Sequence, residues 1–442
     1  MGAEPRDFQR DAVSHHVAVI RKHGASAEAS VPGFGKTYVG GFVAREMKHR
    51  PVVVCPKVVI PHWQRALADC GVVPRFVSNY EQFKLLKTEL GEWERKPAVH
   101  RRPDGSRKKT TGGTWRWTFP KPTLLIFDEA HYCKSRTSQN AKLMLAARRQ
   151  GIPTLAMSAT LAVDPLDLYA TGYLLGLHDG DLTFPGFLAQ YGCLRLGFDW
   201  EFCPRHDPTA LDRLNRLIFP EHGHRKSYEQ IPGFPAATTT VTPVPGDPDA
   251  LQKLAVEWER VREIEQLKQE AVTAVVERLR ARQIAELAKV PAIVEMARDF
   301  INSGLSVPIF LNFHDSIDAV ARELKAGVID GRASPYNREQ YISEFQDDRR
   351  HVLVLQSQAG GVGISLHDVR GVRPRHSILS PGDDSRALIQ CLGRNRRDGA
   401  KSPAFRTILT LSGSIESVVQ RRLEQKINQI DTINDGDLDP LS

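Results

Sequence analysis

The segment ASVPGFGKT, at residues 29–37, has the residue types and the spacing that a phosphate site needs. Gly33 and Gly35 have no side chain, so backbone N–H groups can curl around a phosphate there. Lys36 can reach the terminal phosphates of a nucleotide, and the hydroxyl of Thr37 can hold Mg²⁺. Serine replaces the first glycine of the usual spacing, which leaves a plain helix-capping turn as the alternative.

Two adjacent acids follow an apolar run in LLIFDEAH, at residues 124–131. The four apolar residues predict a buried strand whose carboxyl end presents Asp128 and Glu129. Asp128 is suited to hold the water shell of Mg²⁺, and Glu129 to orient and polarise an attacking water. A pair of acids after a strand is common by itself. After a GKT segment, the pair predicts the hydrolysis of a nucleoside triphosphate.

Short β-rich runs, most of them continuously apolar, supply the elements that must position these residues. Such strands are typical of parallel sheets that are covered on both faces. They form two groups, at residues 52–54, 123–127, 154–157, 308–311, 352–355 and 407–411. A charge-rich stretch with helical spacing lies between the groups, at residues 247–288.

We therefore predict an α/β protein with two tandem, doubly wound parallel-sheet lobes that are joined by a helical connection. Prolines near residue 235 interrupt regular secondary structure and mark the expected end of the first lobe. The expected domains are a first lobe at residues 1–235, a linker with a helical protrusion at 236–290, and a second lobe at 291–442.

In these motifs the chain resembles superfamily-two helicase-like ATPases and, within them, Swi/Snf-type DNA translocases of the bare-motor bacterial or phage type. The resemblance implies RecA-like lobes that bind ATP and Mg²⁺. In the first lobe, Gln9 resembles the residue that pairs with adenine, and Ser158 and Thr160 resemble the motif that couples the nucleotide to the other lobe. The resemblance also implies DNA contacts in motifs Ia and Ib, at Pro56, Lys57 and Tyr80.

The second lobe carries the remaining motifs of this resemblance. QSQAGGVGISL, at residues 356–366, resembles motif V and implies DNA contacts at Ser357, Gly360 and Gly361 and an ATP contact at Gly363. QCLGRNRR, at residues 390–397, resembles motif VI and implies an ATP contact at Gln390 and arginine fingers at Arg394 and Arg397. A guanidinium that reaches across the cleft stabilises charge on the transferring phosphoryl group, a contribution of roughly 10³ to 10⁵ in rate.

A basic insert interrupts the first lobe at residues 94–118. Seven of its lysines and arginines precede Trp115 and Trp117. One hypothesis is a loop that holds phosphates and stacks its tryptophans on bases. The other is a solvated β-hairpin around Asp104 and Gly105, with the tryptophans anchoring its base.

The formal net charge of +8 suits a partner that is rich in phosphate. The amino terminus lacks the apolar core of a signal peptide, and no apolar run is long enough to span a membrane. We expect a cytoplasmic protein without a membrane partner, in a bacterial cytosol or nucleoid or in a host cytoplasm if viral. The motor unit is expected to be a monomer. The mixed cluster of Cys193, Cys203, His206, His222 and His224 matches no standard zinc spacing, although a metal site there stays open.

The expected function is ATP-driven movement along duplex or branched DNA, largely independent of DNA sequence. A strand-separating helicase or branch-migration enzyme is the nearest alternative. An RNA-directed enzyme and a non-hydrolysing nucleic-acid scaffold that uses ATP as a conformational ligand are the others.

Overall fold

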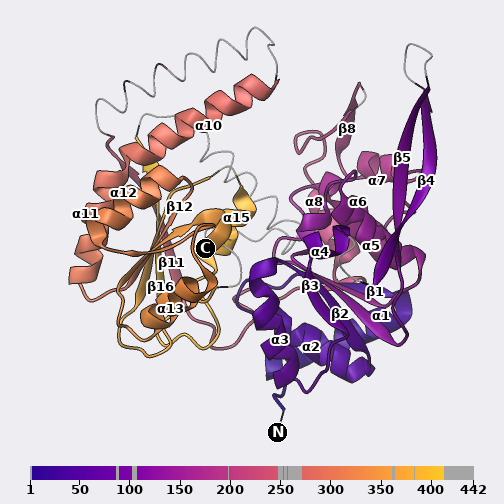
Figure 1. Cartoon of the computed structure of the whole chain (residues 1–442), viewed down its shortest axis with the longest axis horizontal. Helices are drawn as coiled ribbons and strands as arrows, with labels where there is room; N and C mark the ends of the chain where they lie inside the picture. The colour runs from indigo at the N-terminus through magenta and orange to yellow at the C-terminus, as the bar shows by residue number, and fades with distance from the viewer. Residues whose placement is uncertain are drawn as a thin grey trace. The chain divides into compact units, whose positions relative to one another are not determined.

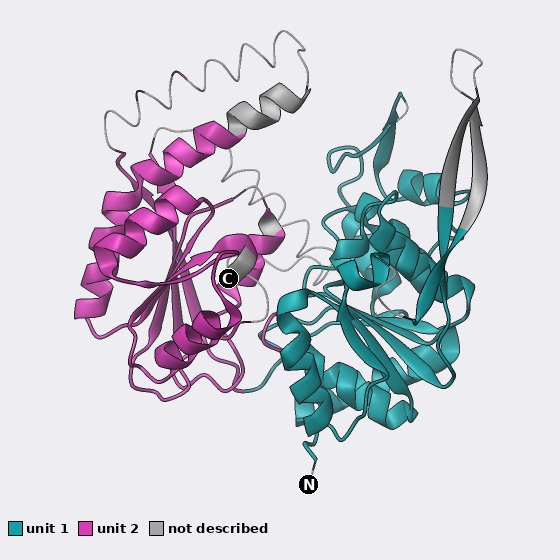
Figure 2. Cartoon of the chain, viewed as in Figure 1, with its two compact units in different colours: residues 1–31, 35–232, 428–440 teal, residues 32–34, 233–427, 441–442 magenta. Residues whose placement is uncertain are grey.

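The structure is a computed structural model that describes residues 2–85, 89–101, 107–197, 199–246, 252, 256, 271–360, 364–382 and 384–412. It divides into two compact units (Figure 2). The described part of the first unit comprises residues 2–31 and 35–232. That of the second unit comprises residues 32–34 and the described residues from Gly233 onward.

The described residues of the first unit form a parallel sheet of six strands in the order β10-β1-β7-β6-β2-β3, of which β1, β2 and β3 are labelled in Figure 1. These strands are β1 (Ala25–Glu28), β2 (Arg50–Cys55), β3 (Phe76–Asn79), β6 (Thr123–Asp128), β7 (Thr154–Met157) and β10 (Gly223–His224). The apolar residues of β2 and β6 are buried, as expected for a parallel sheet with both faces covered.

Helices of the first unit form two groups of neighbours. One group is α1 (Asp7–His23), α2 (Lys36–Met47) and α3 (Ile60–Asp69), which contact one another in succession. The second includes α5 (Gln139–Arg149) and α6 (Tyr169–Leu175), which pack together. The shorter helices are α4 (Tyr80–Lys84), α7 (Phe184–Gln190) and α8 (Ala210–Ile218). Two separate helix groups are the pattern of a doubly wound sheet.

The basic insert is an antiparallel hairpin of β4 (Gly91–Arg101) and β5 (Arg107–Trp117). Trp115 and Trp117 are 2% and 4% exposed and belong to the main core of the unit. The indole N–H of Trp117 donates to the carbonyl oxygen of Leu143 at 3.0 Å. Base stacking by these two tryptophans was therefore a wrong prediction, and their anchoring role is confirmed. The turn at residues 102–106 and the side chains of the seven basic residues lie outside the described part.

The second unit also has a parallel sheet of six strands among its described residues, in the order β11-β16-β15-β12-β14-β13. Its strands are β11 (Ala237–Val244), β12 (Val307–Leu311), β13 (Gly327–Ile329), β14 (Val352–Gln356), β15 (Arg375–Leu379) and β16 (Ala404–Leu411). The predicted α/β class with two parallel-sheet units is confirmed. A second hairpin, β8 (Cys193–Leu196) with β9 (Asp199–Phe202), belongs to the first unit.

β11 corrects the expected extent of the linker. Residues 237–244 were assigned to the linker and protrusion, but they form an edge strand of the second sheet. The strand pairs with β16 over its whole length, from Ala237 opposite Ala404 to Val244 opposite Leu411. Its threonine-rich sequence is mostly exposed, so it lacks the apolar run that marks a central strand.

The helices of the second unit are α10 (Ala271–Ala288), α11 (Val290–Asn302), α12 (His314–Leu324), α13 (Pro335–Gln346), α14 (Ser357–Gly360) and α15 (Ser385–Leu392). α10 is the described end of the predicted charge-rich helical stretch. The buried carboxylate of Glu286 holds α10 in place, because it accepts the backbone N–H groups of Asn312 and Phe313. In the described ranges, no helix has the length and apolar character that crossing a membrane requires.

We predict that Trp117→Ala lowers the free energy of unfolding of the first unit by about 3–5 kcal/mol, because it empties a core site and removes an indole hydrogen bond. Leu182→Ala is the control, since Leu182 is 95% exposed and its truncation is expected to cost less than about 0.5 kcal/mol. Denaturant unfolding of both variants measures the difference. If both variants lose the same small amount of stability, the result would contradict a core position for Trp117.

Candidate functional site

The phosphate loop joins the end of β1 to the start of α2. Gly33 and Gly35 have φ angles of +87° and +85°, in the left-handed region that glycine enters without steric cost. Gly35 is the N-cap of α2, so the helix begins at Lys36 and directs its first free N–H groups toward the loop. Thr37 follows within the first turn and is partly buried. This is the geometry that binds a phosphate group at a helix N-terminus.

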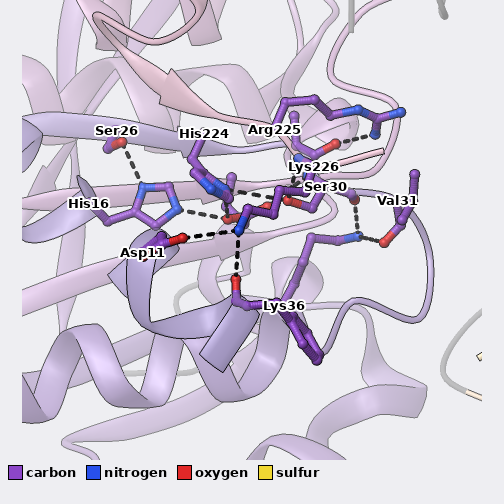
Figure 3. Close-up of polar contacts among 12 residues, drawn as sticks. Asp11, His16, Ser26, Ser30, Val31, Lys36, His224, Arg225 and Lys226 are labelled. Atoms are coloured by element: carbon purple, nitrogen blue, oxygen red, sulfur yellow. Dashed lines mark hydrogen bonds and ion pairs between the residues drawn. The ribbon is translucent and has the colours of Figure 1, made fainter. Parts of the chain in front are cut away.

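The amine of Lys36 lies inside this loop. It donates hydrogen bonds to the carbonyl oxygens of Ser30 at 2.6 Å and Val31 at 3.1 Å (Figure 3). Burial lowers the pKa of Lys36 to about 8, while the negative charges of Glu28 and Glu129 act in the opposite direction. The ammonium form is therefore held by carbonyl oxygens and nearby carboxylates, and phosphate oxygens would supply stronger, charged acceptors.

Gln9 packs against the same loop. Its side chain is almost fully buried, and its Oε1 accepts the backbone N–H of Arg6 at 3.1 Å. A Cβ atom placed on Gly35 would lie 2.5 Å from Nε2 of Gln9, so only glycine fits beside this amide. The structure thus brings Gln9 to the loop, whereas its contact with adenine stays a prediction.

The acid pair lies at the carboxyl end of β6. Asp128 Oδ2 accepts the indole N–H of Trp63 at 2.7 Å, and Oδ1 accepts the backbone N–H of Glu129 at 3.0 Å. Burial raises the pKa of Asp128 to about 7, and the charge of Glu129 raises it further, while the Trp63 bond and the charge of Lys36 oppose them. Two neighbouring carboxylates in a buried place carry excess negative charge, which a divalent cation would relieve. The residues therefore fit the predicted Mg²⁺ at Asp128.

Glu129 has an unusual backbone, with φ +53° and ψ +53° in the left-handed region. That conformation costs a residue with a side chain about 1–3 kcal/mol and recurs where a catalytic group must be aimed. Oε2 of Glu129 lies 3.3 Å from Nδ1 of His131. The same Nδ1 lies 3.0 Å from the hydroxyl of Ser158, which in turn bonds the backbone of Thr160. His131 links the acid pair to the predicted coupling motif. Sequence reasoning gave His131 no role, although the histidine in LLIFDEAH was visible.

The DNA contacts predicted in the first unit are contradicted at one residue and stay predictions at two others. Tyr80 is 4% exposed, and its hydroxyl donates to the backbone carbonyl of Asp128 at 2.8 Å. A direct DNA contact by Tyr80 was therefore a wrong prediction, because the ring supports the acid pair from inside the unit. Pro56 is partly buried and Lys57 is exposed, just after the end of β2. Their DNA contacts stay predictions.

In the second unit, Arg394 and Arg397 share one acceptor. Each donates to the carbonyl oxygen of Ile364, at 3.1 Å and 3.0 Å respectively. This carbonyl belongs to the predicted motif V, so the two motifs of the second unit are joined by it. Gln390 lies on α15 and is partly buried. The approach of both arginines to the nucleotide stays a prediction.

The motif V residues are described in part. The hydroxyl of Ser357 is buried and donates to the carbonyl oxygen of Leu311 at 3.1 Å, which contradicts a DNA contact through that group. Gly360 is the last residue of α14. Gly361 and Gly363 lie outside the described residues. A cavity of about 300 Å³ opens at this end of the sheet, lined in part by Arg282, Asn312, Phe313, Ser357, Gln358 and Asp384.

Comparisons with known proteins identify chains that are similar in sequence or fold. Residues 288–399 match the family described as the helicase conserved C-terminal domain. A protein of Acanthamoeba polyphaga mimivirus, named as an ATP-dependent RNA helicase, is 29% identical over 458 aligned residues, which cover 98% of this chain and 84% of the relative.

Two further matches are a DNA repair and recombination protein and the structure of a protein bound to RNA. A RAD54-like DNA repair and recombination protein of Drosophila persimilis is 30% identical over 126 residues, 28% of this chain and 16% of the relative. The structure of S. cerevisiae Dbp5 bound to RNA and ADP BeF3 has a TM-score of 0.51 and 11% identity, and the match covers 95% of this chain and 88% of that one. The likeness to Dbp5 concerns the fold. Together, the findings show a tandem RecA-like fold, and the sequence matches are to ATP-hydrolysing, helicase-like proteins.

We predict that Trp63→Phe moves the acid limb of the pH–rate profile for ATP hydrolysis upward by about 1–2 pH units. Without the indole donor, the carboxylate of Asp128 loses a charge-assisted hydrogen bond and its pKa rises further, so the ionised form that holds Mg²⁺ is lost at a higher pH.

Trp93→Phe is the matched control for this experiment. It also loses an indole hydrogen bond within the first unit, to the carbonyl of Lys84, but away from the acid pair. An unmoved acid limb in the Trp63 variant, or the same shift in both variants, would contradict the role of Trp63.

Proposed function

We propose that the protein hydrolyses ATP with Mg²⁺ in order to move along duplex DNA, largely without regard to DNA sequence. The observation that carries the proposal is the electrostatic arrangement in the first unit. The buried Lys36 amine feels the charges of both Asp128 and Glu129, and burial raises the pKa of Asp128 and lowers that of Lys36. Perturbed groups of opposite charge beside a phosphate loop are what phosphoryl transfer requires.

Each residue of the site has a defined part in this proposal. Lys36 exchanges the carbonyl oxygens of Ser30 and Val31 for the β- and γ-phosphate oxygens of ATP. Asp128 and Thr37 hold Mg²⁺, which neutralises charge on the phosphates when it is bound. Glu129, aimed by its left-handed backbone, orients the attacking water and accepts a share of its proton.

His131 and the two arginines connect hydrolysis with movement. A change at Glu129 reaches Ser158 through His131, which contacts both side chains. Arg394 and Arg397 stabilise charge on the γ-phosphoryl group as it transfers, and they lose that contact after hydrolysis. Their shared bond to Ile364 carries this alternation into motif V, so the grip on the DNA backbone changes with the nucleotide state.

Duplex DNA is favoured as the track by the Swi/Snf-like motifs and by the similarity of a quarter of the chain to RAD54-like proteins. The net charge of +8 suits a sequence-independent grip on phosphates. An RNA-directed helicase is the second candidate, and the mimivirus relative favours it because the similarity spans nearly the whole chain.

We predict that Lys36→Ala and Glu129→Gln each lower the nucleic-acid-stimulated release of phosphate at least about 100-fold, because each removes a group that acts on the transferring phosphoryl or the attacking water. Lys22→Ala and Glu46→Gln are matched controls, since both of these side chains are exposed on α1 and α2. Full activity in either site variant refutes the assignment.

We predict that duplex DNA stimulates ATP hydrolysis more strongly than single-stranded DNA, forked DNA or RNA. Phosphate release is measured with each polynucleotide, and displacement of a triplex-forming strand reports movement along the duplex. Strand separation on forked DNA without triplex displacement would replace the translocase with a strand-separating helicase. Stimulation by RNA alone would favour the second candidate.

A further inference from the structure

Three side chains from distant segments meet beside the phosphate loop: His16 on α1, Glu28 at the end of β1, and His224 on β10. Nε2 of His16 lies 2.8 Å from Oε2 of Glu28, and Nδ1 of His224 lies 3.1 Å from the same oxygen. One ligand atom from each residue lies within 4.8 Å of the other two. Within the described ranges, no other group of three His, Cys, Asp or Glu side chains is this close.

This trio is enclosed. The side chains of His16 and Glu28 have no exposed surface, and that of His224 is 12% exposed. Ionised carboxylates are costly inside a protein unless a positive charge compensates them. Hydrogen bonds with His16 and His224 compensate Glu28 in this structure, and an ion bound by both imidazoles would supply a full positive charge in their place.

The hydrogen bonds around the trio orient its ligand atoms. Nδ1 of His16 lies 2.8 Å from the hydroxyl of Ser26, which itself donates to the carbonyl oxygen of His222. When Ser26 accepts the Nδ1 proton of a neutral His16, the lone pair of Nε2 faces Glu28 and can bind an ion. In the other tautomer Nε2–H donates to the carboxylate, and an ion would take the place of that proton.

A hydrogen bond also orients the carboxylate of Glu28. Oε1 of Glu28 accepts the backbone N–H of Ser30 at 2.7 Å, which leaves Oε2 to face both histidines. Metal-binding sites are commonly built in this way, with the second ring nitrogen and the second carboxylate oxygen bonded to outer groups. His15 adds a third imidazole, with its ring centre 5.8 Å from the centres of His16 and His224. Nε2 of His15 is buried and has no hydrogen-bond partner within the described structure.

We propose that His16, Glu28 and His224 bind a divalent transition-metal ion, and that Zn²⁺ is the ion whose ligand preferences they fit best. Two imidazole nitrogens and one carboxylate oxygen are standard zinc ligands, whereas Mg²⁺ and Ca²⁺ prefer oxygen throughout. Ligand atoms around a tetrahedral zinc ion lie roughly 3.3 Å apart, so each imidazole nitrogen needs to move away from Oε2 of Glu28 by only a few tenths of an ångström.

The ion would have a structural role, separate from the Mg²⁺ that the proposed function places at Asp128. It would join α1, β1 and β10, segments that up to 196 residues of chain separate. It would also fix Glu28, which holds the N–H of Ser30 in the phosphate loop. Of the cysteines and histidines that the sequence offered as a metal cluster, His224 alone belongs to this group.

The test uses the full chain after removal of metals with a chelator, in buffer that holds millimolar Mg²⁺ to saturate the magnesium site. Co²⁺ is titrated in as the probe, and its visible absorption reports tetrahedral coordination. Zn²⁺ is then added to displace it. We expect one tight Co²⁺ per chain, and an affinity at least about 100-fold lower in Glu28→Gln and in His224→Gln.

His222→Gln is the matched control, because His222 is two residues from His224 but outside the trio. Circular dichroism of the metal-free variants shows whether they remain folded. X-ray absorption at the zinc edge of the wild-type protein, which needs no variant, is expected to show imidazole and oxygen ligands without sulfur. Absence of a tight site in the wild type, unchanged binding in both trio variants, or sulfur ligands would overturn the proposal.

Discussion

Parallel pairing of three strands brings the candidate site residues of the first unit together at the carboxyl ends of those strands. Met157, the last residue of β7, pairs with Glu28 on one side and with Asp128 on the other. The strands β1, β6 and β7 therefore end in register, and the groups that follow them emerge side by side. The phosphate loop continues β1, the acid pair ends β6, and Ser158 follows β7. A shift of one residue in either pairing would turn these side chains to the opposite face.

Burial of charged groups determines the electrostatics at this end of the sheet. Water is displaced from around Lys36 and Asp128, so each loses much of the solvation of its charged form. The bonds that they make within the protein, to carbonyl oxygens and to one indole N–H, replace that solvation in part. The magnesium nucleotide of the proposed function would bring anionic oxygens to the lysine and a cation to the aspartate. Its binding would be favoured by charged groups that have lost part of their solvation in the fold.

Local sequence patterns predicted the parts of the site that are continuous in the chain. The glycines of the loop and the run LLIFDE fix both their own conformation and their chemistry, which is why Lys36 and the acid pair were identified. Trp63 bonds Asp128 across 65 residues, and Glu28 meets His224 across 196. The hydrophobic periodicity of a segment cannot predict such pairings, because they depend on the order of the strands in the sheet. The tryptophans of β5 were ambiguous for a related reason, since an aromatic beside lysines suits either a core or a nucleic-acid surface.

The edge strand β11 has a mechanical consequence. The chain leaves the first unit and enters the second through this strand, which runs parallel to β16 and pairs with it along eight residues. Tension applied along the axis of β11 would load the hydrogen bonds of the ladder together rather than one after another. A polypeptide attached in this shearing geometry withstands far larger forces than one that is peeled from its end. The second sheet thus offers an anchorage suited to repeated pulling.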